Sequence, residues 1–465
     1  MKRPLVFVLV LTFAVLAIFL FLRRRDAGNP TPSPWRDALD RVDLRVFLTG
    51  QTQSYLDVCG CATRQEGGLA PRATLLSDLR KQASATICLD AGGLLGKSES
   101  LDVERAEVNL AAMEDMNYDA VLLSGPDLAR GYELLAGLAQ DSTLEFISCN
   151  VAAADGREAF WSPFRILERG GRKLAVIGLS RLFGVGPPAQ VNGFVFLEYL
   201  SAFTEARRAL QSFEPDLTLL LCDLAPGLDD AVLASLPGVD LILTFGVADA
   251  TGAAGSRPVL FSVPKGMRLT WADVEFSSLG PRFSSGERSV SEGVPKDPVV
   301  QRRLEQFYQR IVDQYGPSSP KPLAGFKEEK DEKNFYVGAT FCKDCHKPEY
   351  AQWETTTHSI AYNLLYGPNR HYAPDVFAYY VTGWGAPTGF HRVDPTHPLA
   401  HVGCETCHGP GGRHLESEKK EDIRGKVGKD VCLACHVPAW DPHFEREYDQ
   451  KLKAVLHRPA KDAGD

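Results

Sequence analysis

The sequence has no surplus of positive charge, and its first 345 residues contain no histidine. The 465 residues include 51 lysines and arginines against 59 aspartates and glutamates, which gives a net charge of -8. Nucleic-acid binding needs a clustered basic face, so this balance argues against a nucleic-acid partner. All 11 histidines lie at or after position 346. Chemistry that depends on imidazole therefore belongs to the last part of the chain.

One long apolar run stands near the N-terminus. Residues 4–22 have Thr12 as their only conventionally polar member, and basic residues flank both ends. A helix of this length is roughly 28 Å long, close to the hydrocarbon thickness of a bilayer. We expect residues 1–28 to form an uncleaved membrane helix, because arginines at positions 23–25 stand where a cleaved signal peptide would have small residues. A cleaved signal peptide is the alternative.

The chain is long enough for two domains. Between residues 42 and 280, short apolar runs bounded by glycine, proline and aspartate alternate with helix-like segments. Runs of this kind predict the buried strands of a layered α/β domain. The predicted strands cover residues 44–49, 85–90, 119–124, 144–150, 174–180, 216–222 and 240–245.

A helix and a linker are expected to connect this domain to the rest of the chain. Asp297 suits a helix N-cap with Pro298 at the first helical position, apolar residues recur at helical spacing, and Gly316 can end the helix. A linker rich in proline, serine, lysine and glutamate follows over residues 317–334. The remaining residues, 335–465, form the third region.

Three copies of the pattern C-x-x-C-H lie within this third region. In c-type cytochromes the two thiols form thioethers with haem, and the adjacent histidine ligates the iron. Zinc is the main alternative, because paired C-x-x-C motifs also form four-cysteine sites, but zinc leaves the histidine after every pair unexplained. We therefore predict three covalently bound haems c. The attachment and ligand residues are Cys342, Cys345, His346, Cys404, Cys407, His408, Cys432, Cys435 and His436.

Haem attachment also predicts a compartment. Thioethers to haem form on the outer face of the energy-transducing membrane, in an oxidising environment. We therefore expect the chain to sit in a bacterial inner membrane through one N-terminal helix, with its bulk in the periplasm. The expected partners are redox proteins, either other cytochromes or a membrane respiratory complex.

A haem iron with two protein ligands needs a second one besides the motif histidine, here called the distal ligand. A resemblance to a known family indicates which histidines take this role. Residues 336–358, with C-x-x-C-H followed by Tyr350, Trp353 and a histidine, resemble the opening of cytochrome c-554 family multihaem proteins. Residues 403–414 resemble the family's C-H-G-P-G-x-x-H element, and residues 432–457 its final segment. The resemblance implies a mainly helical, loop-rich domain, although four-haem members of the family carry one more motif. It also implies His358, His414 and His457 as distal ligands, with His401 in reserve.

A second resemblance covers the first domain. The order of segments over residues 46–248 is similar to that of calcineurin-like metallophosphoesterases in their secreted nucleotidase branch, which implies an αββα sandwich. That family holds two metal ions through D-x-H, G-D, G-N-H and two later histidine elements. Amides and glycines cannot hold such a pair of ions, so we expect no phosphohydrolase activity and a role in docking or assembly. The corresponding positions carry Gln51, Gln53, Gly93, Gly125, Pro126, Asp223, Gly246 and Ala248.

Five further cysteines precede the haem motifs. Cys88, Cys149 and Cys222 fall in strand-like apolar runs, where a buried thiol acts as a small hydrophobe. Cys59 and Cys61 lie in a loop near the lost metal positions. A disulfide to another cysteine, or a redox or metal role, stays open for these two.

Two functions are consistent with these features of the sequence. The first is electron transfer between redox partners by haems that each have two histidine ligands. The alternative is a multihaem oxidoreductase in which one haem keeps an open position for a small nitrogen or oxygen compound. Eight histidines outside the motifs are more than three irons require, which favours the electron-transfer protein.

Overall fold

A computed structural model describes most of the chain between the expected membrane helix and the C-terminus. Residues 1–28 and 317–333 lie outside the described residues, so the structure leaves the predicted anchor untested. No helix within the described ranges is long and apolar enough to cross a membrane. The described residues are 35–36, 39, 41–59, 66–96, 101–181, 188–224, 229–246, 251–254, 256–291, 293–315, 334–365, 377–384, 386–390, 396–436, 441 and 444–457.

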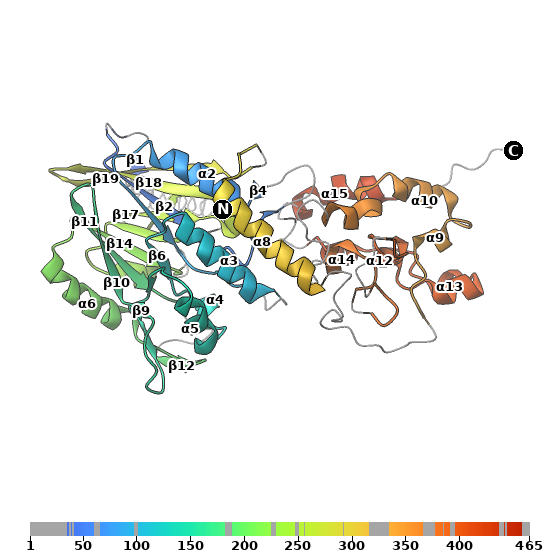
Figure 1. The fold of residues 1–465 in the computed structure, drawn as a ribbon, viewed down its shortest axis with the longest axis horizontal. Helices are drawn as coiled ribbons and strands as arrows, with labels where there is room; N and C mark the ends of the chain where they lie inside the picture. Colours follow the sequence, from blue (N-terminus) through green and yellow to red (C-terminus); the bar gives the residue numbers. More distant parts are fainter. Residues whose placement is uncertain are drawn as a thin grey trace, which may run out of the picture.

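Two β-sheets form the centre of the first domain (Figure 1). The first has eight strands in the order β1-β19-β18-β2-β5-β6-β7-β9, with parallel pairing from β2 through β9. Its strands are β1 (Trp35–Arg36), β2 (Leu44–Thr49), β5 (Thr86–Asp90), β6 (Ala120–Leu122), β7 (Phe146–Ile147), β9 (Trp161–Ser162), β18 (Arg268–Ser277) and β19 (Gly280–Ser289).

The second sheet has six strands in the order β10-β11-β14-β15-β17-β16, and strands β11, β14, β15 and β17 run parallel. They are β10 (Phe164–Arg169), β11 (Arg172–Leu179), β14 (Leu217–Cys222), β15 (Leu241–Phe245), β16 (Thr251–Ala254) and β17 (Arg257–Ser262). Two small sheets complete the described strands: β8 (Val151–Ala153) with β12 (Ala189–Val191) and β13 (Phe194–Phe196), and β3 (Val58–Cys59) with β4 (Glu66–Gly67).

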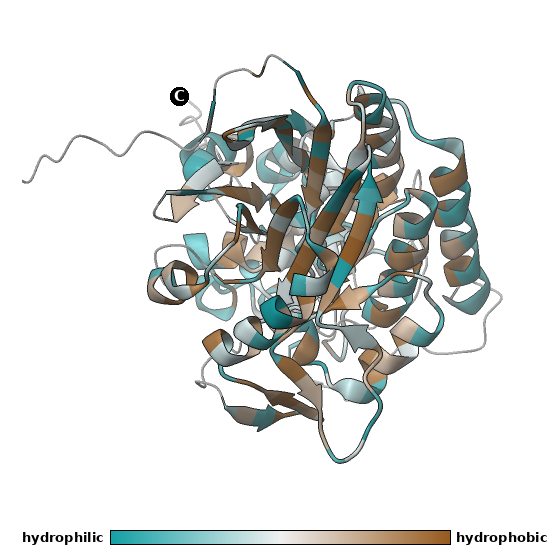
Figure 2. Cartoon of the chain, turned by 90° about the vertical axis from the view of Figure 1, so that its left-hand side faces the viewer, coloured by the Kyte–Doolittle hydropathy of each residue, from teal (hydrophilic) through white to brown (hydrophobic). Residues whose placement is uncertain are grey.

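Alternation of side chains along the strands explains the layers. In β2, Val46 and Leu48 enter the core between the sheets, which also contains Leu174 of β11. Phe47, between them in sequence, points to the opposite face and joins the helix-facing core. Because both faces of both sheets are apolar, each sheet needs a second sheet on one side and helices on the other. The strands in Figure 2 are accordingly mostly brown, whereas the peripheral helices alternate brown and teal.

Helices cover the two outer faces and complete an αββα sandwich. Leu76, Met113 and Leu304 belong to one core with Phe47, which places their helices on the first sheet. Phe203 and Leu233 belong to the core on the second sheet. The first set is α2 (Leu69–Arg80), α3 (Asp102–Asp115) and α8 (Pro298–Tyr315), and the second is α6 (Tyr199–Leu210) and α7 (Asp230–Ser235).

The structure departs from the predicted strands at one informative place. A strand was expected over residues 144–150, but β7 ends at Ile147. Beyond it the Cys149 amide donates to the Gly178 carbonyl at 2.8 Å, and the Asn150 side chain donates to the Ser180 carbonyl at 2.7 Å. Both acceptors lie in or just after β11, so the chain leaves the first sheet here and crosses to the second.

Helix α8 leads from the sandwich to the C-terminal region. Asp297 caps it, since its Oδ1 accepts the Val299 and Val300 amides at 2.9 and 3.1 Å. Arg303 pairs with Asp115 of α3 at 2.8 Å. Val300, Leu304 and Ile311 pack into the same core as Phe47 and so hold the helix to the sandwich along its length. The C-terminal region lies beyond the helix at one end of the molecule (Figure 1).

The C-terminal region consists of short helices and loops. Its α-helices are α9 (Ala339–Cys342), α10 (Lys347–Glu354), α11 (Phe377–Tyr380), α12 (Cys404–His408), α13 (Gly412–Ser417), α14 (Lys429–Leu433) and α15 (Phe444–Val455), and its 3-10 segments are η3 (Thr357–Leu365) and η5 (Lys420–Asp422). An apolar cluster that includes Tyr362, Val381 and Phe390 supports them.

Candidate functional site

Each C-x-x-C-H motif adopts a helical turn. In α12 all five motif residues are helical, and in the other two motifs the histidine amide donates to the carbonyl of the first cysteine, at 2.9 Å for His346 and 2.8 Å for His436. Residues three and four apart lie on one face of a helix, so the two thiols and the imidazole of a motif project to the same side. None of the six motif cysteines takes part in a disulfide bond. This is the arrangement that attachment to one edge of a haem requires.

Every motif histidine faces a second histidine from elsewhere in the chain. The ring centroids of His346 and His414 are 6.1 Å apart. The same separation of 6.1 Å joins His358 to His436 and His408 to His457. A bond from imidazole nitrogen to a first-row metal is about 2 Å long, so two imidazoles on opposite sides of one ion have ring centres roughly 6 Å apart. All three pairs therefore have room for one ion between the rings.

Hydrogen bonds at Nδ1 orient most of these rings. His408 and His414 place Nδ1 2.7 and 2.8 Å from the backbone carbonyls of Arg424 and Lys419. A carbonyl can only accept, so Nδ1 carries the proton and Nε2 keeps a free lone pair. His457 makes the same kind of bond to Gln352 Oε1 at 3.0 Å. Burial, with His436 as a second cause, lowers the pKa of His358 to about 4, so this ring too is neutral and able to ligate.

Exposed apolar side chains accompany the paired histidines. Leu415 and Leu456 are sequence neighbours of His414 and His457, and are 46% and 58% exposed. Single exposed leucines are common on protein surfaces, but here every distal histidine has an exposed apolar residue within two positions in the sequence. A haem macrocycle is a large apolar disc that would cover them. The set also includes Phe341 at 56%, Ile360 at 46% and Leu364 at 45%.

The motif thiols show how the three sites are arranged. Cys342 and Cys404 hydrogen-bond to each other, which raises the pKa of Cys342 and lowers that of Cys404. Burial and then the nearby Cys432 and Cys435 raise the pKa of Cys407 to about 11. The second motif thus lies between the first and the third.

A buried carboxylate joins the first two motifs. Glu405, inside the second motif, is 2% exposed, and it accepts the backbone amides of Val337 at 2.9 Å, Gly338 at 2.7 Å and Gly411 at 2.7 Å. Two of these amides immediately precede α9, which carries Cys342. Glu405 carries no signal in the sequence, because its role depends on contacts with distant backbone.

The remaining histidines do not face a motif histidine within the described residues. His401 accepts the Tyr362 amide at Nδ1, at 3.2 Å, and burial lowers its pKa. His397 accepts the Leu399 amide at 3.2 Å. His371, His391 and His443 lie outside the described residues.

The phosphoesterase-like positions meet at the C-terminal edges of the parallel strands. Gln51 and Gln53 follow β2, and Gly93 follows β5. A β-carbon on Gly93 would come within 2.5 Å of Gln51 Nε2, so the Gln51 amide fills the space of a side chain at 93. Gly125 begins α4 (Gly125–Leu128), Asp223 and Gly246 follow β14 and β15, and Ala248 lies outside the described residues.

The carboxylates of this centre bind backbone amides instead of facing a common point. Asp127 accepts the Gly93 and Leu95 amides at 2.6 and 3.0 Å. Asp223 accepts the Gly125 amide at 2.6 Å and also the Arg181 amide. Burial raises the pKa of Asp223 to about 7 and also raises that of Asp127. These bonds tie neighbouring loops together.

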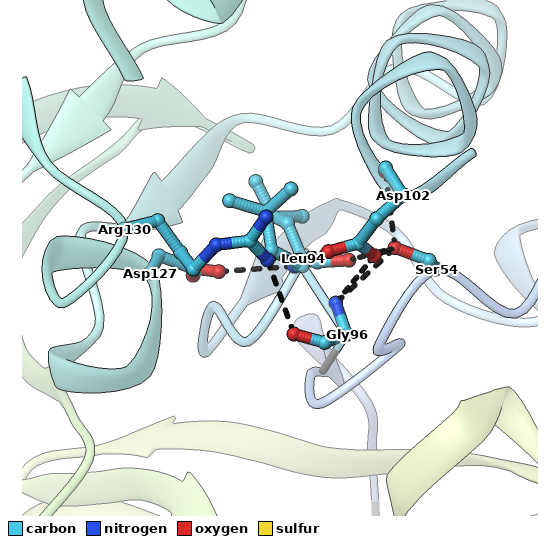
Figure 3. Close-up of polar contacts among 7 residues, drawn as sticks. Ser54, Leu94, Gly96, Asp102, Asp127 and Arg130 are labelled. Carbon is cyan, nitrogen blue, oxygen red and sulfur yellow. Dashed lines mark hydrogen bonds and ion pairs between the residues drawn. The ribbon is translucent and has the colours of Figure 1, made fainter. Parts of the chain in front are cut away.

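A second group of polar contacts closes the adjoining loop (Figure 3). Asp102 at the start of α3 accepts the Gly96 amide at 2.7 Å and also bonds to Ser54 and Arg130. Arg130 in turn donates to the Gly96 carbonyl at 3.2 Å. Among the described residues no group of three or more His, Cys, Asp or Glu side chains is arranged to hold a metal ion by itself.

The cysteines of the first domain divide as follows. Cys88, Cys149 and Cys222 are buried free thiols, and burial raises the pKa of each to about 12, as suits small apolar core residues. Cys59 ends β3, and Cys61 lies outside the described residues. A disulfide or redox role for the last two stays a prediction.

The first domain and the C-terminal region are similar to different groups of known proteins. Residues 341–409 match the family model for cytochrome c554 and c-prime. The chain is 29% identical over 135 residues to cytochrome c-554 of Nitrosomonas europaea, a match that covers 22% of this chain and 57% of that protein. This similarity implies covalently bound haem c in the C-terminal region.

The first region is similar to a different group. It is 27% identical over 165 residues to protein UshA of Yersinia enterocolitica, covering 33% of this chain and 29% of that protein. The fold is similar to that of a 5'-nucleotidase precursor from Thermus thermophilus, with a TM-score of 0.51, 19% identity and coverage of 58% of this chain and 59% of that one. The sulfate thiohydrolase SoxB from Thermus thermophilus gives a TM-score of 0.52 at 17% identity, covering 62% of this chain and 64% of that one.

The chain thus joins a calcineurin-like phosphoesterase fold to a cytochrome c554-like region. It spans less than two thirds of the length of UshA and of cytochrome c-554.

Proposed function

We propose that this protein is a three-haem c-type cytochrome that transfers electrons between redox partners. The observation that carries the proposal is the common 6.1 Å separation in three histidine pairs, each with one motif histidine. Haem bound there would supply one-electron redox chemistry. We assign His346 and His414 to the first haem, His408 and His457 to the second, and His436 and His358 to the third.

The side chains of this region would hold the haems and shield them. The six motif thiols would fix the haems covalently, and two histidines for each iron would leave no position for a substrate. The exposed apolar residues beside the distal histidines would cover the macrocycles. Cys404 and Cys407 lie close to thiols of the first and third motifs, which favours a row with the second haem in the middle.

We further propose that the first domain is not a phosphohydrolase and serves docking or assembly. Gln51 fills the space beside Gly93, and the carboxylates Asp127 and Asp223 are engaged with backbone amides. The purified protein should not hydrolyse nitrophenyl phosphate esters with added manganese or zinc. Co-purification from membranes, with and without residues 42–280, tests docking: an unchanged set of partners and an unchanged electron-transfer rate would remove this role.

The proposed location is the periplasmic side of a bacterial inner membrane, with residues 1–28 as an anchor. Haem attachment supports the compartment, and the apolar run supports the anchor. The protein should fractionate with membranes and be released when residues 1–28 are replaced by a cleavable signal peptide. Recovery of the natural protein in the soluble periplasmic fraction would contradict the anchor.

Haem stoichiometry and carbon monoxide binding test the electron-transfer proposal. We expect three haems per chain and no carbon monoxide binding after reduction, because two histidines would ligate each iron. Rapid binding of one carbon monoxide per chain would favour the alternative, an oxidoreductase that acts on a small nitrogen or oxygen compound at an open haem.

A further inference from the structure

One of the six paired histidines bonds to a carboxylate. His436 Nδ1 lies 2.9 Å from Asp441 Oδ2. The Nδ1 atoms of His408, His414 and His457 instead face neutral oxygens. For His346 and His358 the described residues show no such bond. The third pair therefore has an electrostatic environment that the other two lack.

Asp441 is held firmly for this contact. It is 7% exposed, and Lys451 Nζ donates to both of its oxygens at 2.7 Å. Phe444 stacks on the His436 ring, with centroids 4.2 Å apart and planes 13° from parallel. The carboxylate and the aromatic ring together fix both the direction and the plane of the imidazole.

A carboxylate at Nδ1 changes the electron-donor strength of a metal-bound histidine in a definite direction. A carboxylate that accepts the Nδ1 proton makes the imidazole a stronger electron donor. A stronger donor stabilises ferric iron more than ferrous iron, and hydrogen bonding around the ligands is one way in which proteins set haem potentials. The haem at the third pair should therefore be harder to reduce than a haem with neutral partners at Nδ1.

We propose that Asp441 is a positioning residue that gives the haem between His358 and His436 the lowest reduction potential of the three. This inference rests on the proposed three-haem function. The third motif is at one end of the row, and its helix α14 lies nearer the sandwich than α13, which carries His414 (Figure 1). A low potential at that end directs electrons from the third haem toward the first.

The test is a spectroelectrochemical titration of the full-length protein with its haems in place. In Asp441→Asn, one haem of three should shift to a higher potential by at least about a tenfold change in its reduction equilibrium, equal to about 59 mV. Asp441→Glu should retain a potential near the natural one. Glu447→Gln is the matched control, because Glu447 pairs with Lys451 at 3.5 Å without bonding to the ring, and it should shift the potential much less.

If Asp441→Asn fails to retain its haem, a second variant still tests the proposal. Lys451→Met removes the ammonium group that bonds to the Asp441 carboxylate. The full negative charge of Asp441 then acts on His436, so the same haem should shift to a lower potential. Three haems with unchanged potentials in Asp441→Asn, or no downward shift in Lys451→Met if the first variant loses haem, would overturn the inference. Fewer than three haems in the natural protein would instead count against the proposed function.

Discussion

The side-chain amide of Gln51 lies so close to the α-carbon of Gly93 that a β-carbon there would come within 2.5 Å of Nε2. Gly93 also has φ of +72°, a conformation that other residues adopt at a cost. Two features therefore disfavour a side chain at position 93: the overlap with the Gln51 amide and the positive φ of the backbone. The end of the Gln51 side chain would have to move before a bridging aspartate could be placed at this position.

Gly93→Ala should therefore destabilise the first domain by about 2–4 kcal/mol, since strain and overlap add. Gly156→Ala is the matched control, because Gly156 has the same φ of +72° with nothing within 4 Å of a β-carbon, and it should cost only about 1 kcal/mol. Urea unfolding measures both. In a protein that also carries Gln51→Ala, the cost of Gly93→Ala should fall close to that of the control. Equal costs for the single variants Gly93→Ala and Gly156→Ala would contradict the contact with Gln51.

Removal of one distal histidine should open one haem. In His358→Ala the third iron would lose its second ligand, so the reduced protein should bind one carbon monoxide per chain, seen as a change in the Soret band. His401→Ala should bind none, because His401 faces Tyr362 and no motif histidine. Binding after the His401 change but not after the His358 change would transfer the ligand role to His401.

Glu405 should stabilise the haem region more than an ordinary glutamate at the protein surface would, because its side chain is only 2% exposed. Glu405→Ala leaves three backbone amides without their acceptor, which should cost about 3 kcal/mol or more. Glu416→Ala, at an exposed position, should change stability by no more than about 0.5 kcal/mol. Thermal unfolding followed at the haem bands compares them, and similar midpoints would refute the role of Glu405.

The buried carboxyl of Asp223 predicts a pH dependence of stability. Burial raises its pKa from 3.8 in the unfolded chain to about 7 in the folded protein, so between these values the folded state binds the proton more tightly. The contribution of this group is then largest below about pH 4 and declines as pH rises toward 7, by up to about 4 kcal/mol. The free energy of unfolding of the natural protein minus that of Asp223→Asn should fall over this range. A difference independent of pH would show that Asp223 does not titrate this way.

The strands that the sequence predicts best are those buried on both faces. β2 matches its predicted residues, and β14 and β15 differ from theirs by one residue at the start. The β18–β19 hairpin was not predicted, because its pattern is interrupted by charge: Asp273 in β18 pairs with Arg45 at 2.6 Å in a buried position. Only the partner strand explains that aspartate.

Some residues of the candidate site could be predicted from the sequence and others could not. The motif residues follow from local spacing, and the resemblance to cytochrome c-554 named the three distal histidines. Which histidine faces which motif could not be predicted, because the partners are far apart in sequence and meet only through the fold. Asp441 and Glu405 carried no signal for the same reason, since each is one acidic residue among many in the sequence.

The crossed pairing of the histidines means that the C-terminal region cannot be divided motif by motif. His457 faces the second motif, and His358, which follows the first motif, faces the third. Removal of the chain from His457 onward would thus leave the His358–His436 pair intact and take away the partner of His408. Among the described residues no motif completes a histidine pair from its own segment of sequence, so the proposed haem sites would have to be gained, kept and inherited together.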